Sequence, residues 1–137
     1  MTKLKTKLYD KFKLQQLGVD FMGYEFETKK DLTYHHIQPK NMGGQTTFEN
    51  GALLIRTSHN YIHTIQDFDY KLFLELSQEL KKEHTQGEIT RDRLITIAQI
   101  LKYFEDKYKN SYTKGGSQLI KEDFVRRRII LWRIILI

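Results

Sequence analysis

Hydrophobic and polar residues along the chain follow two periods, one typical of helices and one typical of strands. Over 4–17, leucine and phenylalanine recur at near-helical spacing, which predicts a helix that ends at Gly18. We expect strands or strand-like segments over 19–26, 32–34 and 52–55. Residues 39–48 contain the single proline and two adjacent glycines, so they predict a loop between the second and third of these segments.

The second half of the chain predicts helices. The expected helices are 58–68, 69–84 and 91–109, followed by a turn over 110–117 and a last helix from 118 to near the C-terminus. Residues 57–58 offer an N-cap for the first, Gly87 ends the second, and Thr90 can cap the third. The third has an apolar face formed by Leu94, Ile97, Ala98, Leu101 and Phe104. The pattern predicts an α+β fold, a short β-hairpin among helices, in a single domain over 1–137.

Composition narrows the class of protein. The 137 residues suit one compact domain, and Lys plus Arg exceed Asp plus Glu by 23 to 17, a balance compatible with a polyanionic partner. There is no cysteine, which excludes disulfides, zinc ribbons and thiol catalysis and permits a cytoplasmic location. The most apolar run, 129–137, is interrupted by Arg133 and is too short to span a bilayer, so we expect a soluble protein without a membrane partner.

Histidines are the strongest chemical signal. Four of the five lie between His35 and His63. His59 and His63 stand four residues apart, so on a helix they share a face and can hold one divalent metal ion. His35 and His36 point to opposite faces of a strand, so one can complete the metal site while the other takes a proton. His84 has no partner in sequence, and we interpret it as structural.

Several motifs recur at characteristic spacing between residues 34 and 63. They are Tyr34-His35-His36-Ile37-Gln38-Pro39-Lys40-Asn41-Met42-Gly43-Gly44, then Asn50, Leu53-Leu54, Ser58-His59 and His63. In residue type and spacing this set resembles the HNH nuclease family. They are most similar to the His-His…Asn…His-x-x-x-His version in colicin-type DNases, over about 19–65. The resemblance implies a ββα-metal core over 19–68, a helical extension over 69–137, and a metal-dependent endonuclease that hydrolyses DNA.

The resemblance also assigns roles to residues. It implies three metal ligands, His35, His59 and His63, and makes His36 the general base. Asn50 would be the family's middle asparagine, which ties down the loop and helps to orient the base. Asn41 and Asn60 are alternatives that fit less well, because one lies early in the loop and the other lies beside a ligand.

The ligand set and the nearby cations suggest cofactors and contacts. Three neutral imidazoles favour Zn²⁺ or Ni²⁺, whereas Mg²⁺ or Mn²⁺ are the ions we expect for turnover, because magnesium binds once phosphate oxygens join its shell. The candidate nucleic-acid-binding residues are Lys29, Lys30, Lys40 and Arg56. Of these we favour Arg56 for the scissile phosphate, although surface charge of no special function explains each of them about equally well.

One departure from the family concerns structure. Many HNH proteins carry two Cys-x-x-Cys pairs around a structural zinc ion. Here Val19 and Met22 stand in place of the first pair, and Ile55 and Ser58 in place of the second. Because three of the four are apolar, we expect a small hydrophobic cluster to replace the zinc.

Two other functions stay open at the level of sequence. The main alternative is a catalytically silent HNH-like module that binds nucleic acid or a partner protein; the complete ligand set with His36 favours the enzyme. A metal-regulated transcription factor is weaker, since no helix-turn-helix spacing stands out. The resemblance suggests a phage, a mobile element or a bacterial defence system as the setting, and the apolar segment 129–137 predicts a homodimer contact.

Overall fold

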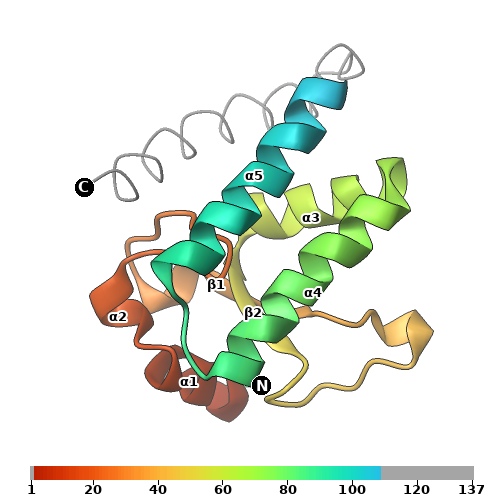
Figure 1. The fold of residues 1–137 in the computed structure, drawn as a ribbon. Helices are drawn as coiled ribbons and strands as arrows, with labels where there is room; N and C mark the ends of the chain where they lie inside the picture. The colour runs from red at the N-terminus through yellow and green to blue at the C-terminus, as the bar shows by residue number, and fades with distance from the viewer. Residues whose placement is uncertain (1, 109–137) are drawn as a thin grey trace.

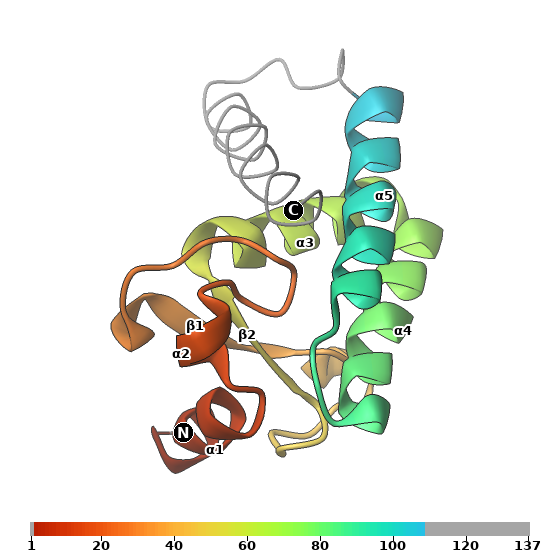
Figure 2. The same ribbon diagram turned by 60° about the vertical axis from the view of Figure 1, so that its left-hand side comes forward.

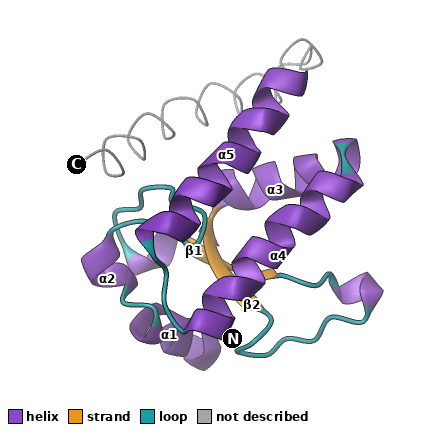
Figure 3. Ribbon diagram, viewed as in Figure 1, coloured by secondary structure: helices purple, strands orange, loops and turns teal. Residues whose placement is uncertain are grey.

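A two-stranded antiparallel sheet lies at the centre of the computed structural model, which describes residues 2–108 (Figure 1). Strand β1 (Leu32–His36) pairs with β2 (Gly51–Ile55), so that His36 lies opposite Gly51 and Leu32 opposite Ile55. The remaining elements of the described residues are helices, as Figure 3 shows by colour. The predicted α+β class, with a short hairpin among helices, is confirmed.

Helices cover both faces of this hairpin. Helix α1 (Thr2–Lys11) brings Leu8 to one face, where the space above Gly51 is filled by Leu8 and the ring of Tyr34. Helix α3 (Arg56–Phe68) follows β2 directly and lies on the other face, because its His59 bonds to Thr33, whose side chain points away from that of Tyr34. The side chains of Thr33 and His35 therefore meet α3.

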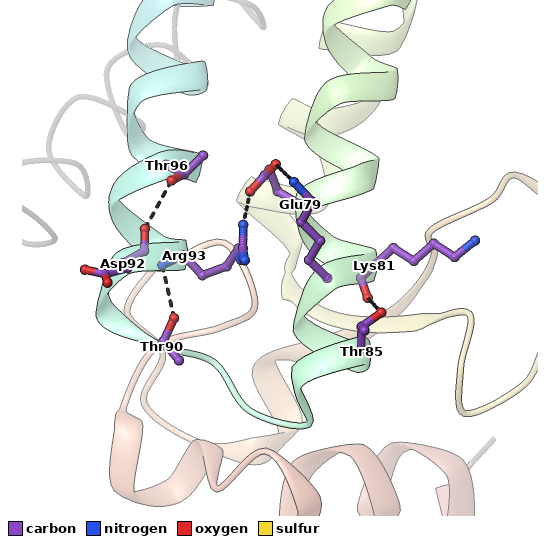
Figure 4. A network of polar contacts seen from close by, with 8 residues as sticks. Glu79, Lys81, Thr85, Thr90, Asp92, Arg93 and Thr96 are labelled. Carbon is purple, nitrogen blue, oxygen red and sulfur yellow. Dashed lines mark hydrogen bonds and ion pairs between the residues drawn. The ribbon is translucent and has the colours of Figure 1, made fainter.

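Two long helices complete the core beside α3 (Figure 2). Helices α4 (Tyr70–Gln86) and α5 (Arg91–Tyr108) match the predicted segments, and Gly87 ends α4 in the left-handed conformation. The predicted apolar face of α5 is buried in full. Figure 4 shows the polar contact between the two helices, an ion pair between Arg93 of α5 and Glu79 of α4. At the start of α5, the Thr90 hydroxyl accepts a hydrogen bond from the Arg93 backbone amide at 3.1 Å.

The N-terminal helix is broken where the sequence predicts continuity. Helix α1 ends at Lys11 and a short helix α2 (Leu14–Leu17) follows, with Lys13 at a φ of 53° between them. The break lets the ring of Phe12 pack against Phe21 and against His84 at the end of α4, with centroid distances of 4.8 and 5.1 Å. Tertiary packing here overrides helix periodicity.

The composition of residues 19–26 predicts a strand, but the segment forms a tight turn instead. One β-bridge between Val19 and Glu25 closes this turn. The side chain of Asp20 causes this, because its Oδ1 accepts hydrogen bonds from the backbone amides of Met22 and Tyr24 at 2.9 and 3.0 Å. An aspartate that binds its own following backbone favours a turn over an extended ladder.

The start of α3 also differs from the prediction. The helix begins at Arg56, so residues 57–58 lie inside its first turn and are not its N-cap. The hydroxyl of Ser58 is buried and donates to Asp20 Oδ2 at 2.6 Å, so the residue belongs to a tertiary contact.

Other predictions fall on residues outside the described part of the chain. These are the turn over 110–117, the last helix from 118, and the homodimer contact at 129–137, which stay predictions. Among residues 2–108, none of the helices has the length and apolar character needed to cross a membrane.

Candidate metal centre and catalytic histidine

Three histidines from two elements meet between β1 and α3. His35 comes from the strand, and His59 and His63 come from successive turns of the helix. One ring nitrogen of each lies within 4.8 Å of those of the other two. The ring centroids are 5.0 to 5.6 Å apart. Three imidazoles this close together could hold one metal ion.

The environment of His35 fits a bound metal. Its side chain is only 2% exposed, and neither ring nitrogen has a hydrogen-bond partner among the described residues. A buried polar group without a partner costs free energy, and a metal ion would satisfy one of the two nitrogens. The donor set of neutral imidazoles is also one that divalent zinc and nickel prefer. The residues present therefore fit a divalent ion.

The hydrogen bonds of Thr33 determine which nitrogen of His59 is free. The Thr33 hydroxyl donates its proton to the carbonyl of Leu54 at 2.8 Å, and it lies 2.8 Å from His59 Nδ1. A hydroxyl has one proton, so towards His59 it can only accept, and Nδ1 must carry a hydrogen. The lone pair of His59 is then on Nε2, ready for a metal. His63 has a similar arrangement, with its Nδ1 at 3.3 Å from Gln66 Oε1.

Burial keeps His35 and His59 neutral, as metal ligands must be. Loss of hydration, and then the charges of His59, His63 and His36, hold the pKa of His35 well below its usual value. Loss of hydration lowers the pKa of His59 to about 4, with smaller effects from neighbouring positive charges. At His35 and His59 a metal ion therefore meets little competition from protons at neutral pH.

His36 opens on the same cavity as the three-histidine cluster. The cavity has a volume of about 410 Å³, and its wall includes His35, His36, His59, His63, Lys40 and Asn41. The ring of His36 packs against that of Tyr34 with a centroid distance of 4.9 Å. Nε2 of His36 lies 2.8 Å from the Thr46 hydroxyl. Burial, and then the charge of Lys40, lower the pKa of His36, so it too is neutral near pH 7.

Asn50 makes the contacts of a residue that ties down the loop. Its Oδ1 accepts from the Gln38 amide at 2.8 Å, and its Nδ2 donates to the carbonyls of Gln38 and Gln45 at 3.1 and 2.9 Å. None of these bonds reaches the ring of His36, whose partner is Thr46. The hydrogen bond to the ring of His36 is therefore made by Thr46, a residue that the sequence analysis missed. Of the alternatives, Asn41 lines the cavity and Asn60 is exposed on α3.

Two of the four candidate cations lie near the histidines, and the other two lie elsewhere. Lys40 lines the cavity, and exposed Arg56 is close enough to His59 for its charge to affect the pKa of that ring. Lys29 instead donates to Thr6 of α1 at 2.6 Å, in the turn that precedes β1. Lys30 follows in the same turn. Neither of the last two belongs to the cavity wall, so they are not brought to the histidines.

A buried aspartate lies among the residues that, by the resemblance described above, replace the structural zinc site of many HNH proteins. Val19, Met22 and Ile55 are buried, as expected for an apolar cluster. The sequence analysis missed Asp20, which is fully buried among them and joins the turn 19–25 to the junction of β2 and α3. Its Oδ2 accepts from the Ile55 amide at 3.0 Å and from the hydroxyl of Ser58. The only hint of this in the sequence is a charged residue within an apolar segment.

Comparison with known proteins agrees with this geometry. The family model of HNH endonucleases matches residues 23–64, the segment that carries the loop and all four histidines. The resemblance found in the sequence is thus confirmed for this segment, which is less than half of the chain. No curated protein and no solved structure matches the chain. Residues 23–64 are thus similar to HNH endonucleases, which suggests a nuclease-type function, and in the structure they carry three histidines that could hold one metal ion.

Proposed function

We propose that the protein is a metal-dependent endonuclease that hydrolyses phosphodiester bonds of DNA. The observation that carries the proposal is the shared cavity: a neutral histidine, His36, faces the same space as the cluster of His35, His59 and His63. A base beside a metal site, inside a segment that matches the HNH family, is the arrangement that phosphodiester hydrolysis needs.

In this proposal the residues of the chain divide the work. His35, His59 and His63 hold one divalent ion, which supplies Lewis-acid stabilisation of charge on the phosphate when it is bound. His36 accepts the proton of the attacking water, for which a neutral imidazole is required. Lys40 and Arg56 offer positive charge to the phosphate backbone. We expect Mg²⁺ or Mn²⁺ to support turnover and Zn²⁺ or Ni²⁺ to bind more tightly.

The proposal extends to the organisation of the chain. We propose that 19–68 form the nuclease core and that the helices after residue 69 support it. We also propose that the apolar segment 129–137 forms a homodimer contact, which would place two sites on one duplex. Light scattering of the full chain and of a chain without 129–137 tests this part: a monomer at micromolar concentration in the full chain would contradict it.

Nicking of supercoiled plasmid tests the activity. Purified protein is incubated with plasmid in the presence of Mg²⁺, Mn²⁺, Zn²⁺ or Ni²⁺, beside His36→Ala and, as a matched control away from the cavity, Lys102→Ala. We expect wild type and the control to nick, and His36→Ala to lose roughly 10²–10⁴-fold in rate while it still binds metal. Absence of nicking with every metal would favour the silent module, and full activity of His36→Ala would remove this histidine from the mechanism.

A further inference from the structure

The partner of the His36 ring is a threonine held in place from both sides. The Thr46 hydroxyl lies 2.8 Å from His36 Nε2. On one side, the carbonyl of Gln45 accepts a hydrogen bond from Asn50 Nδ2 at 2.9 Å. On the other side, the Tyr34 hydroxyl donates to the Thr47 carbonyl at 2.7 Å and accepts from the Thr47 amide at 3.1 Å. The backbone around Thr46 is therefore fixed although its side chain is exposed.

This arrangement has a consequence for the chemistry of His36. A general base must keep one ring nitrogen free of hydrogen, and the other nitrogen then carries it. Where Nε2 donates its hydrogen to Thr46 Oγ1, the lone pair is on Nδ1. After Nδ1 has taken a proton, Nε2 still donates to the same oxygen, so the bond persists while positive charge forms on the ring.

Asn50 does not bond to the ring of His36 directly. Its oxygen is already bonded to the amide of Gln38, and its nitrogen is bonded to the carbonyls of Gln38 and Gln45. It acts one step away, by holding the loop that carries Thr46. Tyr34 plays the matching part from β1, where its ring also contacts His36.

We propose that Thr46 is the positioning residue of the general base: its hydroxyl accepts a hydrogen bond from His36 Nε2, fixes the ring and leaves Nδ1 as the basic nitrogen. This proposal rests on the proposed function, in which His36 takes the proton of water. It assigns Asn50 and Tyr34 to the support of Thr46, which links β1, the loop and the base in one hydrogen-bonded unit.

The test compares Thr46→Val, which keeps the shape and removes the hydroxyl, with Thr46→Ser, which restores it. Thr85→Val makes the same change on the exposed surface of α4 and serves as the control. Single-turnover cleavage of a DNA duplex is measured over a range of protein concentrations. We expect Thr46→Val to lower the saturating rate by about 10–100-fold without changing the half-saturating concentration, and Thr46→Ser to restore most of the rate.

A second measurement does not depend on cleavage. Nitrogen-15 NMR of the histidine rings in the full chain reports which ring nitrogen carries hydrogen. We expect His36 to show hydrogen on Nε2 in wild type and in Thr46→Ser, and a mixture of the two forms in Thr46→Val. If wild type cleaves and Thr46→Val cleaves equally fast, the role of Thr46 is wrong while the proposed function stands. If wild type does not cleave, the proposed function is wrong, and unchanged ring signals in Thr46→Val would overturn the hydrogen bond as well.

Discussion

Two threonine hydroxyls lie against two of the histidines, and each belongs to a different part of the site. Thr33 is on the strand and contacts His59 of α3, while Thr46 is in the loop and contacts His36. The carbonyl of Leu54 takes the proton of the Thr33 hydroxyl, so this contact has only one possible direction. Groups that bond to the far nitrogen of a ligand orient its ring and raise its basicity.

The contact of Thr33 leads to a prediction about metal affinity. Thr33→Val removes the acceptor for His59 Nδ1 and leaves the ring free to turn or to change its tautomer. We expect the affinity for Zn²⁺ to fall about 10–100-fold, as measured by competition with a chromophoric chelator. Thr33→Ser, which keeps the hydroxyl, should bind nearly as wild type does. Equal affinities of the valine and wild-type proteins would contradict the assigned tautomer.

The sequence alone identifies the four histidines of the candidate site, but it does not identify the threonines that bond to them. The four histidines are recognisable because their spacing agrees with a strand and a helix, and both elements form, although β1 extends past the predicted 32–34 to His36 and α3 begins at Arg56. Thr33 and Thr46 have no such spacing, because their roles depend on how the helix packs on the strand and on how the loop folds back to β1. A hydroxyl gains its function here from tertiary geometry, which a pattern of residue types does not contain.

At the scale of elements, one buried carboxylate joins the turn 19–25 to the junction of β2 and α3. Asp20 accepts four hydrogen bonds, two from its own turn and two from the junction of β2 and α3. Burial raises the pKa of Asp20 to about 6, although these bonds favour the charged form. The network can also accept a proton on Asp20, because the Ser58 hydroxyl lies 3.2 Å from the carbonyl of Ile55 and can donate there.

Asp20 therefore makes stability depend on pH in a direction that can be worked out. Its pKa is raised from 3.8 to about 6 in the folded protein, so between pH 4 and 6 the folded state binds more protons than the unfolded state. The contribution of Asp20 to the free energy of unfolding must then fall as pH rises through this range, by up to about 3 kcal/mol for the full shift. Nearby buried Glu83 has a pKa raised well above its usual value by burial and by Asp20, an effect of the same sign.

The variant Asp20→Asn isolates this contribution. It cannot titrate, so the stability of wild type minus that of the variant should be larger at pH 4 than at pH 7. The histidines, whose burial acts in the opposite direction, are present in both proteins and cancel in this difference. Urea unfolding at several pH values measures it, with the exposed Asp67→Asn as control. A difference that does not change between pH 4 and 7 would contradict the role of Asp20.

The elements also show where periodicity succeeds and where it fails. Helices α4 and α5 lie where the apolar spacing predicts them, because each needs only one buried face. The N-terminal helix breaks at Lys13 because Phe12 packs against the rings of Phe21 and His84. The segment 19–26 becomes a turn because Asp20 binds its own backbone. The break in the helix comes from contacts between residues that are far apart in sequence, and the turn comes from the hydrogen bonds of one side chain. Local composition reveals neither.

At the scale of the whole described structure, helices α4 and α5 are part of the same core as the site. His84 of α4 makes a hydrogen bond of 2.6 Å with the carbonyl of Gly51, which lies opposite His36 in the sheet. Tyr61 of α3 packs against Phe104 of α5 with a centroid distance of 5.7 Å. Helix α3, which carries two of the three candidate ligands, is thus packed against α5 through Tyr61.

This packing predicts that the segment matching the HNH family does not fold by itself. A chain that ends at residue 69 exposes Tyr61 and loses the contacts of Phe12 with His84. We expect it to lack a cooperative thermal transition by circular dichroism, with or without Zn²⁺, whereas a chain that ends at residue 108 keeps one. A sharp transition in the shorter chain would mean that the core over 19–68 is independent of the helices.

The central claim is that His35, His59 and His63 bind one divalent ion while His36 stays free to act as a base. A crystal structure of the protein with zinc tests it most directly. The account predicts one ion with three imidazole nitrogens at about 2.0–2.1 Å, those of His59 and His63 being Nε2, and no bond to His36. An ion bound by His36, or one that leaves any of the other three histidines uncoordinated, would contradict it.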